Sequence, residues 1–483
     1  MNNSIIIEKI NNFLYKIQDF LRPIVSASLF LQRFDYFILL LMIILFAASL
    51  FTSSSIMGMI AIMIIVFTVL KMCFVRGQNV EISLSNLILL MFLTICYISV
   101  LFSPYVNLSY KGFFKTLIYI GFYFSMVQFF RFNKNKIVPV IFIICFIITF
   151  ESAYAILQSL HPLEAIATWQ DTSYTDSEHL LSRVYGTLKP YNPNLLAGYL
   201  VIGLSSVTTV AFWAFLGKHK KTFTFAIASL ILTLSAIFLT GCRGAYLGIF
   251  GAFLTAFLLI NVISKNYFSQ QAQKAWKKLC TCIIGLAGFA IVFSPSIFKR
   301  ILSIFMLRGD SSTSFRMNVY QSTWKMFLDN WFSGIGVGNE TFRNMYGLYM
   351  KTGYDALGAY SIYLETAVES GIFALITFVA FFVTLIKSSL KFLKGNFQLE
   401  QKAIIIPILV MLAAVFVHGI FDTVFYRPQL QFLFWTNIAI MSVILEDKKE
   451  YKITNVEQMI MNLANIITTN SEKIIKGVSK WKN

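Results

Sequence analysis

Charge is scarce in this chain: Asp, Glu, Lys and Arg make up 13% of its 483 residues, against 57% hydrophobic residues. That balance, with a mean hydropathy of +0.71, excludes a soluble globular domain. Histidine occurs only four times, and Cys280 and Cys282 have the wrong spacing for a zinc or redox motif, so we expect no metal site. The chain also lacks a GxxxxGK[ST] phosphate loop, a GxGxxG motif after a strand and an internal repeat, and we expect no cofactor.

Long apolar runs fill most of the chain instead. A membrane-spanning helix needs about 20 apolar residues. We therefore predict an all-α polytopic membrane protein with about 12 transmembrane helices. The predicted spans are 36–53, 56–75, 86–104, 113–130, 137–160, 194–216, 222–240, 244–264, 279–297, 360–387, 402–421 and 429–445.

The basic residues predict how these spans are oriented. Lys and Arg are concentrated in the N-terminal arm and in alternate turns, at 71–76, 131–136, 218–221, 265–278 and 387–394. Because cytoplasmic loops carry the excess of Lys and Arg, we predict that both termini are cytoplasmic and that the protein resides in the cytoplasmic (inner) membrane. The net charge of +18 then reflects topology and attraction to anionic lipid headgroups, not nucleic-acid binding.

Three regions follow from this topology. Residues 1–35 form a cytoplasmic amphipathic arm along the membrane surface, residues 36–446 the transmembrane domain, and residues 447–483 a cytoplasmic Lys-rich tail. The outer face carries two long loops, 161–193 and 298–359, of which the second lies between spans nine and ten. We expect the chemistry on this outer face.

Arg243 is the strongest single pointer to function. It stands where the apolar run 222–240 meets the run 244–264, on a short outer turn. A permanent charge at a membrane boundary is costly unless it binds something. Because this turn faces the same compartment as both long loops, the sequence predicts a site at the outer membrane surface.

A second arginine lies in the longer outer loop. The helix-capping run 311–314 precedes apolar residues at helical spacing, which predicts an amphipathic helix on the outer membrane surface; these residues are Met317, Tyr320, Trp324, Phe327, Leu328 and Trp331. The glycines of 334–338 end it. If Ser314 is the cap, Arg316 falls in the first turn, where the helix dipole adds to its charge at a phosphate site. The alternative is that Arg316 only snorkels to lipid headgroups.

Five segments stand in order over about residues 183–428: Arg183–Gly186 with Asn192–Asn194, Thr240–Gly248, Ser314–Arg316 leading to Trp324, Gly334–Gly338, and Leu364–Glu365 with Glu369–Gly371. Together they resemble the O-antigen ligase and polymerase family of bacterial envelope enzymes. The resemblance implies a metal-independent glycosyltransferase that takes a glycan from undecaprenyl pyrophosphate. The acceptor hydroxyl belongs to a lipid core in a ligase and to a growing chain in a polymerase. In a cell without an outer membrane, the product would be a wall or capsular polysaccharide such as a teichuronic acid.

The resemblance assigns catalytic roles to three residues. Arg243 and Arg316 would neutralise the departing pyrophosphate, because guanidinium holds phosphate oxygens bidentately and never loses its charge. Tyr360 and Ser361 stand where family members commonly carry a His-Asn pair, and a phenol with a reference pKa near 10 is a poor base at neutral pH. Tyr360 could instead position the acceptor. The other candidate bases are Asp310, Asp355, Glu365, His418 and Asp422.

The remaining candidates would bind the donor or acceptor: Arg183, Asn192, Asn194, Glu365, His418, Asp422 and Arg427. Each has a structural alternative. In the structural alternative, His418 packs at a helix end, Asp422 caps the turn and Arg427 pairs with it. The corresponding alternative for Arg183 is a pair with a nearby acid. Glu151 lies within a predicted span and needs a polar partner, in a site or in helix packing.

Two other classes of protein stay open. Some relatives in this superfamily are described as inorganic-carbon transporters, and a transporter binds its cargo at the bilayer midplane through Gly- or Pro-broken helices. Here the nine prolines lie mostly at span ends and the charged candidates collect at one face. The second class is a non-catalytic assembly subunit of an envelope complex, which the Tyr at position 360 in place of the family's His supports. The enzyme reading predicts as partners a polyprenyl-pyrophosphate-linked glycan donor, a glycan or lipid acceptor and membrane lipids.

Overall fold

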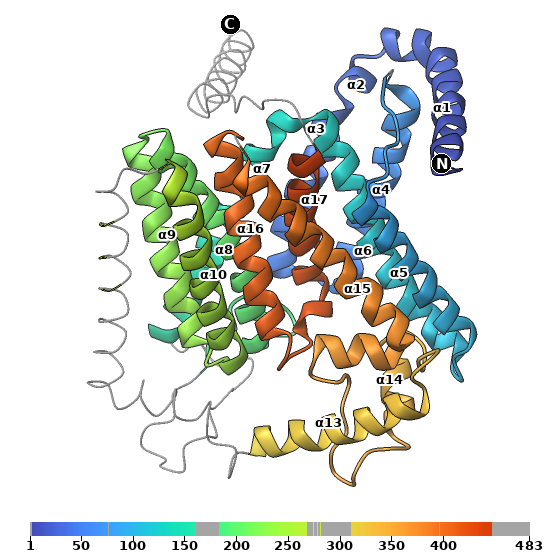
Figure 1. Cartoon of the computed structure of the whole chain (residues 1–483), viewed down its shortest axis with the longest axis vertical. Coiled ribbons are helices and arrows are strands. Elements are labelled where there is room, and N and C mark those ends of the chain that lie inside the picture. The colour runs from blue at the N-terminus through green and yellow to red at the C-terminus, as the bar shows by residue number, and fades with distance from the viewer. Residues whose placement is uncertain are drawn as a thin grey trace, which may run out of the picture.

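The computed structural model describes residues 2–75, 77–160, 183–267, 311–395 and 397–446, with the single positions 274, 278 and 281. Throughout these ranges the regular elements are helices, and eleven of them are long and apolar enough to cross a membrane (Figure 1). The predicted all-α polytopic fold is therefore confirmed. The predicted span 279–297, apart from position 281, and the tail 447–483 lie outside the described residues.

The eleven membrane-crossing helices coincide with the other predicted spans. They are α3 (Phe34–Phe51), α4 (Ser54–Phe74), α5 (Leu84–Leu101), α6 (Val106–Phe132), α7 (Ile137–Leu160), α8 (Pro193–Leu216), α9 (Lys220–Leu239), α10 (Arg243–Tyr267), α15 (Ile362–Lys394), α16 (Leu399–His418) and α17 (Pro428–Glu446). The shorter or amphipathic elements are α1 (Asn2–Ala27), α2 (Leu29–Gln32), η1 (Lys134–Lys136), α13 (Ser311–Asp329), α14 (Asn339–Tyr346) and η3 (Val424–Tyr426).

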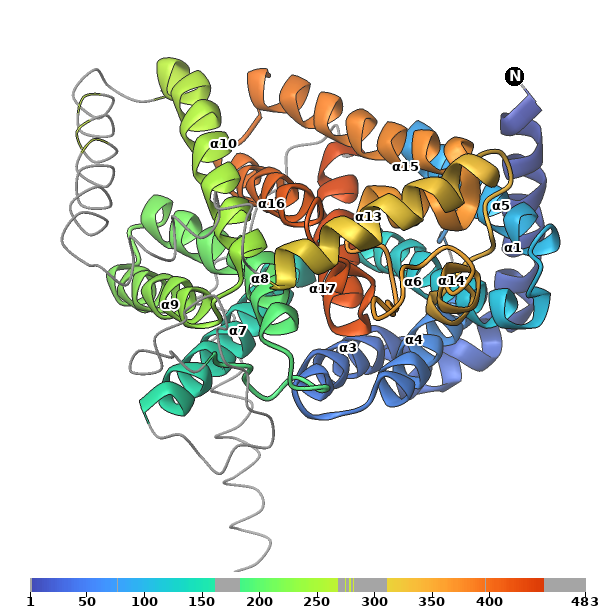
Figure 2. The same ribbon diagram turned by 90° about the horizontal axis from the view of Figure 1, so that it is seen from below.

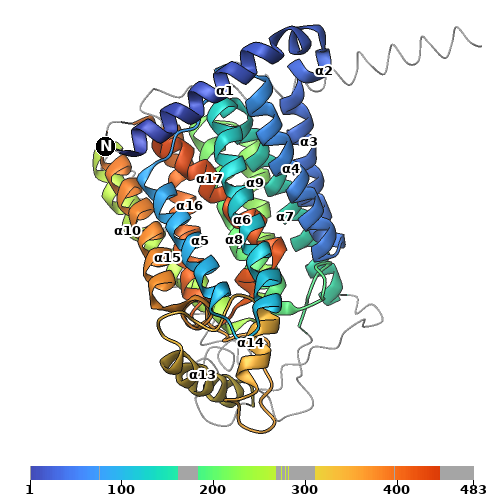
Figure 3. The ribbon, with the colours of Figure 1, turned by 90° about the vertical axis from the view of Figure 1, so that its right-hand side faces the viewer.

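The two ends of the bundle carry different parts of the chain. Helices α13 and α14 cover one end, which we call the α13 end (Figure 1). Figure 2 shows α13 running across this end, from the region of α8 and α10 to that of α5 and α15. Helix α1 lies across the opposite end, the α1 end (Figure 3). The last turn of α17 is also there, because Glu446 Oε2 is 2.7 Å from Arg131 Nη2 at the end of α6.

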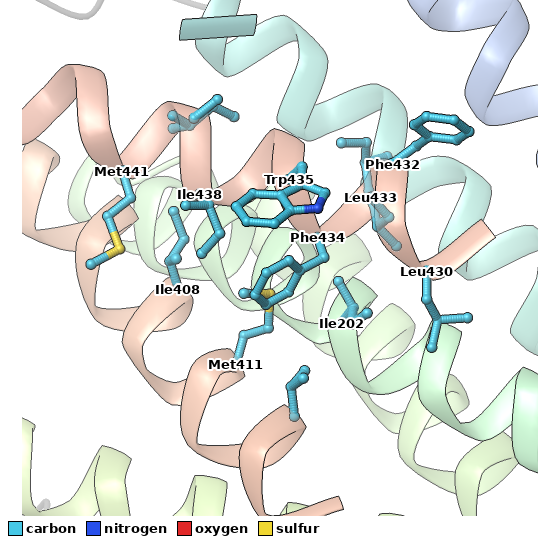
Figure 4. Close-up of a cluster of buried hydrophobic side chains, with 14 of the residues drawn as sticks. Ile202, Ile408, Met411, Leu430, Phe432, Leu433, Phe434, Trp435, Ile438 and Met441 are labelled. Atoms are coloured by element: carbon cyan, nitrogen blue, oxygen red, sulfur yellow. The ribbon is translucent and has the colours of Figure 1, made fainter. Parts of the chain in front are cut away.

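Three spans form the centre of the bundle. The buried share of the most apolar window is 83% in α8, 78% in α16 and 89% in α17, against 28% in α9. Figure 4 shows Phe434 and Trp435 of α17 beside Met411 of α16 and Ile202 of α8. A helix that is apolar all round must be enclosed by protein or lipid, and here protein encloses these three. Their ends at the α13 side are therefore held by packing on several sides.

Helix α15 is broken, which the sequence did not predict. Gly371 has φ 81° and ψ 173°, so residues 362–370 form a short helix that stops before the main span. The loop 334–338 supplies donors to its last carbonyls: Ile335 N–H donates to Val368 O and Gly336 N–H to Glu369 O, both at 2.9 Å. The glycine-rich motif is thus more than a helix stop, because it completes the broken end of α15.

Helix α13 differs from our expectation at its N-terminal part. Residues Ser311–Ser314 already lie within the helix, so Ser314 does not cap it. Arg316 consequently lies beyond the first turn, where the influence of the helix dipole is weaker. Its position on the helix still directs it toward the bundle, as the site geometry shows.

Candidate functional site

Four of the predicted site residues form one connected cluster at the α13 end. Arg183 donates from Nη2 to Asn194 Oδ1 at 2.6 Å, and Asn194 Nδ2 donates to Asp422 Oδ2 at 2.8 Å. The same carboxylate oxygen lies 3.7 Å from Arg316 Nη2. We call Arg183, Asn194, Asp422 and Arg316 the arginine cluster. It joins residues separated by more than 200 positions in the chain, and two of its four members are permanent cations.

The central spans hold this cluster in place. Asn194 lies in the first turn of α8, and Asp422 lies in the turn between α16 and α17, with 5% of its surface exposed. Asp422 Oδ1 also accepts from the backbone N–H of Val424 at 3.0 Å. A carboxylate with both oxygens engaged on packed elements has little rotational freedom. The cluster is therefore preorganised rather than assembled from mobile loops.

Arg183 is positioned by a second network that the sequence analysis did not identify. Its Nε donates to Thr240 O at 2.7 Å, beside Gly241. The loop that follows is fixed by Glu151 of α7, which accepts from Thr187 N–H at 2.8 Å and from Thr187 Oγ1 at 2.7 Å. Glu151 is fully buried, and the two hydrogen bonds from Thr187 compensate for the water that its carboxyl group loses. Glu151 thus holds the loop that carries Arg183.

Two helix N-termini open at the cluster. Asn192 is the N-cap of α8, where its side chain accepts from Asn194 N–H at 2.8 Å, so its structural role is capping. Arg243 is the first residue of α10 and is half-buried. It adjoins Gly241, which packs against Arg183, and Gly244, which packs against His418. Helix N-termini carry partial positive charge, so these two add to the arginines in favouring an anion.

Tyr360 lies beside Arg316. The Arg316 guanidinium carbon is 5.7 Å from the centre of the Tyr360 ring, within the range of a cation–π contact. Burial raises the pKa of the Tyr360 phenol above its usual value, the Asp422 carboxylate raises this pKa further, and Arg316 opposes them. The phenol is therefore an even poorer general base than its sequence position suggested. Its φ of 52° is unusual for a bulky residue and marks a constrained turn before α15.

Tyr320 of α13 was not singled out from the sequence as a site residue, yet it ties the helix to this turn. Its hydroxyl donates to Tyr360 O at 3.1 Å and approaches Ile420 O at 3.3 Å. It is one turn beyond Arg316 on the same face of the helix. The hydroxyl thus fixes the rotation of α13 and, with it, the direction of Arg316.

His418 packs at the end of α16, as its structural alternative proposed. Its ring contacts Gly244 of α10 and Gly198 of α8, and Nε2 lies 3.6 Å from the Cys242 Sγ. Only 4% of its surface is exposed. The neighbouring glycines leave room for the imidazole, because a Cβ at Gly244 would lie 2.8 Å from its Cδ2. His418 is the last residue of α16, four positions before Asp422 of the arginine cluster.

The other predicted residues lie apart from the cluster. Glu365 is buried and accepts from Ala359 N–H at 2.8 Å, so it braces the turn before α15. Asp355 forms an exposed ion pair with Arg343 of α14. Arg427 is exposed at the start of α17, and no hydrogen bond or ion pair links its side chain to the cluster in the part of the chain that the structure describes. Asp310 lies outside that part. Of the four candidate bases that the structure describes, Asp422 and His418 are the two at the cluster.

The fold and this site together define a polytopic helical membrane protein with a preorganised cationic site at one end of its bundle. Residues 228–379 match the family model for O-antigen ligase. The match covers less than half of the chain, and it lies within the region whose motifs resemble this family. Arg243, Arg316, Tyr360 and Glu365 fall within the matched residues, whereas Arg183, Asn194, His418 and Asp422 come to the site from outside them.

A curated relative shows a similarity of wider extent. The teichuronic acid biosynthesis protein TuaE of Bacillus subtilis (strain 168) is 24% identical over 249 residues, which cover 48% of this chain. The matched region spans 46% of the relative, less than half of its length.

Proposed function

We propose that this protein transfers or polymerises a glycan from an undecaprenyl-pyrophosphate carrier onto an acceptor hydroxyl at the outer face of the cytoplasmic membrane, in cell-surface polysaccharide biosynthesis. The observation that carries the proposal is the arginine cluster, with Arg243 beside it, at the α13 end of the bundle. The match to the O-antigen ligase family model and the similarity to a teichuronic acid biosynthesis protein support the same class of reaction.

The chemistry requires a cationic site of this kind. The acceptor oxygen forms a bond to the anomeric carbon, the bond from that carbon to pyrophosphate breaks, and the acceptor proton passes to a base. The negative charge that develops on the leaving pyrophosphate must be stabilised at the membrane surface. Arg316 is suited to this because its guanidinium is attracted to Asp422 at 3.7 Å, beyond hydrogen-bond distance, and a quarter of its side chain is exposed, so its donors can bind phosphate oxygens.

Proton removal falls to a group other than Tyr360 in this proposal. Asp422 and His418 are the acceptors that lie at the cluster, and the raised pKa of Tyr360 keeps its phenol protonated at neutral pH. Asp422 also lies between the two arginines. It attracts Arg316 directly, and Asn194 links it to Arg183 by hydrogen bonds. Tyr360 then positions the acceptor or Arg316 through its ring.

The test is reconstitution of the full chain in vesicles with an undecaprenyl-pyrophosphate-linked glycan, with glycan transfer as the readout. Arg243→Ala and Arg316→Ala should each lower transfer on the order of 10²–10³-fold, as loss of one preorganised donor does elsewhere. Arg316→Lys should recover only part of the rate, because an ammonium keeps the charge and loses the bidentate fork.

Arg343→Ala is the matched control. Arg343 lies on α14 at the same end of the bundle, but it is exposed and pairs with Asp355 away from the cluster. Its loss should leave transfer within about threefold, because exposed pairs contribute little. Equal transfer by Arg316→Ala and Arg343→Ala would contradict the site assignment. Ion flux without transfer in the native protein would favour a transporter, and the absence of both activities an assembly subunit.

A further inference from the structure

Helix α1 has three distinct faces along its length. With 3.6 residues per turn, Leu14, Gln18, Leu21 and Val25 share one face. A second face carries the polar or charged residues Glu8, Lys9, Asn12, Lys16 and Asp19, all exposed. Between them lies an apolar stripe of Ile10, Phe13, Ile17, Phe20 and Ile24. A helix between protein and water needs only an apolar face toward the protein and a polar face toward the water. The additional apolar stripe therefore needs a partner of its own.

The first face is docked on the bundle by specific hydrogen bonds. Gln18 is buried, and its Nε2 donates to Met72 O at 2.8 Å and to Gln78 O at 3.0 Å. Gln18 Oε1 accepts from Gly77 N–H at 3.1 Å, and Asn11 exchanges two hydrogen bonds with the backbone of Val80. These bonds tie α1 to the turn after α4. The rotation of α1 about its axis is therefore fixed relative to the spans.

The apolar stripe is left outside this contact. Phe13 is 65% exposed, Phe20 79% and Ile24 57%, which is a large apolar surface for one short face. Further along the chain, Leu29 and Phe30 of α2 are exposed too, and so are Tyr36, Leu40 and Ile44 of α3 at a spacing of four. Exposed apolar residues on a membrane span face lipid, so the chain passes from the stripe of α1 to a lipid-facing span.

We propose that α1 is an interfacial membrane helix, with its apolar stripe seated at the boundary between headgroups and acyl chains of the leaflet at the α1 end. The order of the faces fits this occupant. The docked face meets the bundle, the stripe beside it meets the leaflet, and the polar face meets water. Lys9 and Lys16 border the stripe on its polar side, where their ammonium groups reach anionic headgroups. Figure 3 shows α1 running across the ends of α3, α4 and α6 rather than along them.

The proposal is independent of the glycan-transfer reaction. Its consequence concerns the depth at which the bundle sits in the membrane. Gln18 and Asn11 attach α1 to the α4–α5 turn, so a helix held at the leaflet surface also sets the depth of the spans at the α1 end. A phospholipid leaflet containing anionic headgroups is the partner that matches both the stripe and the flanking lysines.

The test uses the full chain in vesicles of phosphatidylcholine and phosphatidylglycerol. A small environment-sensitive fluorophore is attached at Phe20→Cys, at Phe13→Cys on the same stripe, and at Asn12→Cys on the polar face as the matched control. Signal from the native cysteines is measured in the labelled parent and subtracted. Quenching is measured with a lipid carrying a nitroxide near the top of its acyl chain, and with iodide on both sides of the vesicle.

Lipid nitroxide should quench positions 13 and 20 several-fold more than position 12, and iodide should show the reverse order. Equal iodide quenching at positions 12 and 20 would place the stripe in water and overturn the proposal. Protection of position 20 from both quenchers would show that protein covers the stripe, by a second copy or another partner, and would also overturn it. Disagreement between positions 13 and 20 would show that the stripe does not act as one face.

Discussion

At the scale of single residues, the Asp422 carboxylate sets the net charge of the arginine cluster. It attracts Arg316 and reaches Arg183 through Asn194, so one carboxylate faces two guanidinium groups of the arginine cluster. A like-charged pair of arginines without it would repel in a partly dehydrated site. The carboxylate therefore keeps the cations close together while the cluster retains net positive charge for an anionic ligand.

Tyr360→Phe tests whether the phenol acts as a base. Because burial and Asp422 raise the pKa of Tyr360, its hydroxyl stays protonated at neutral pH, and the aromatic ring that meets Arg316 survives in Phe. We expect transfer to fall by less than about tenfold, under ~1.4 kcal/mol of barrier, with an unchanged pH–rate profile. A drop on the order of 10²–10⁴-fold with loss of one limb of the profile would instead assign Tyr360 as the base.

Tyr320→Phe provides the comparison for this variant. It removes a hydroxyl that donates to Tyr360 O, so the rotation of α13 and the direction of Arg316 become less well fixed. The loss of a hydrogen bond is worth about 0.5–1.5 kcal/mol. Tyr320→Phe should therefore lower transfer at least as much as Tyr360→Phe, although Tyr320 has no reactive role.

Most members of the site could be proposed from the sequence, but not their partners. Arg183, Asn194, Arg316 and Asp422 were all predicted, and the structure brings them into one network. The roles of Glu151 and Tyr320 depend on contacts across the fold, at Thr187 and at Tyr360, which no local spacing encodes. Asn192 and Glu365 were predicted as substrate ligands, and their contacts are those of a cap and a brace.

At the scale of elements, the break in α15 is the main departure from expectation. The apolar run predicted one span over 360–387, whereas the structure breaks the helix at Gly371. The break needs the loop 334–338, which arrives from a distant part of the chain to bond Val368 O and Glu369 O. It lies near the α13 end of the helix, whereas a transporter site would place it at the midplane.

Gly334→Ala tests this interpretation of the glycine-rich loop. Gly334 has φ +72°, and a Cβ there would overlap the backbone carbonyl of Glu369, which cannot move without disturbing the broken end of α15. Gly353→Ala is the matched control, because Gly353 has φ +88° with nothing within 4 Å of an added Cβ. Both carry a backbone cost on the order of 1–3 kcal/mol.

Only Gly334→Ala adds the steric overlap, so its unfolding temperature in detergent should fall well below that of Gly353→Ala. Equal thermal shifts for the two variants would mean that backbone strain alone explains the effect, and that the loop does not need to approach α15 closely.

At the scale of the whole molecule, the arginine cluster and the described chain ends lie at opposite ends of the bundle. Helix α1 docks on the α4–α5 turn, and α17 ends beside Arg131, both at the α1 end. The cluster lies at the α13 end, where α8 and α10 begin and α16 stops. The loop charges predict that the α1 end is the cytoplasmic one.

Topology can be measured with a membrane-impermeant maleimide. Thr352→Cys lies on the exposed loop at the α13 end, and Asn12→Cys lies on the polar face of α1. We expect Thr352→Cys to react in intact spheroplasts and Asn12→Cys to react only after the membrane is permeabilised, because the positive-inside rule places α1 in the cytoplasm. The opposite pattern of labelling would invert the orientation and move the arginine cluster to the cytoplasmic face.

Hydropathy predicted the whole-molecule architecture because each span must satisfy its backbone hydrogen bonds internally and bury about 20 apolar residues in lipid. Hydropathy could not predict which spans lie at the centre of the bundle and which at its periphery. The windows of α9 and α17 both pass the test for a membrane span, yet 28% of one and 89% of the other is buried in protein. Lipid and protein interiors are similarly apolar, so composition does not distinguish a peripheral helix from a central one.

The left-handed turn at residue 360 has a consequence for how this site tolerates exchange. A φ of 52° is uncommon for any side chain, but histidine and asparagine adopt that region several-fold more readily than a bulky aromatic residue does. The local backbone is thus better suited to a smaller polar ring than to the tyrosine it holds. A histidine could occupy this position without a change in the turn. A single substitution at residue 360 could therefore introduce a side chain that transfers protons near neutral pH, with the surrounding loop unchanged.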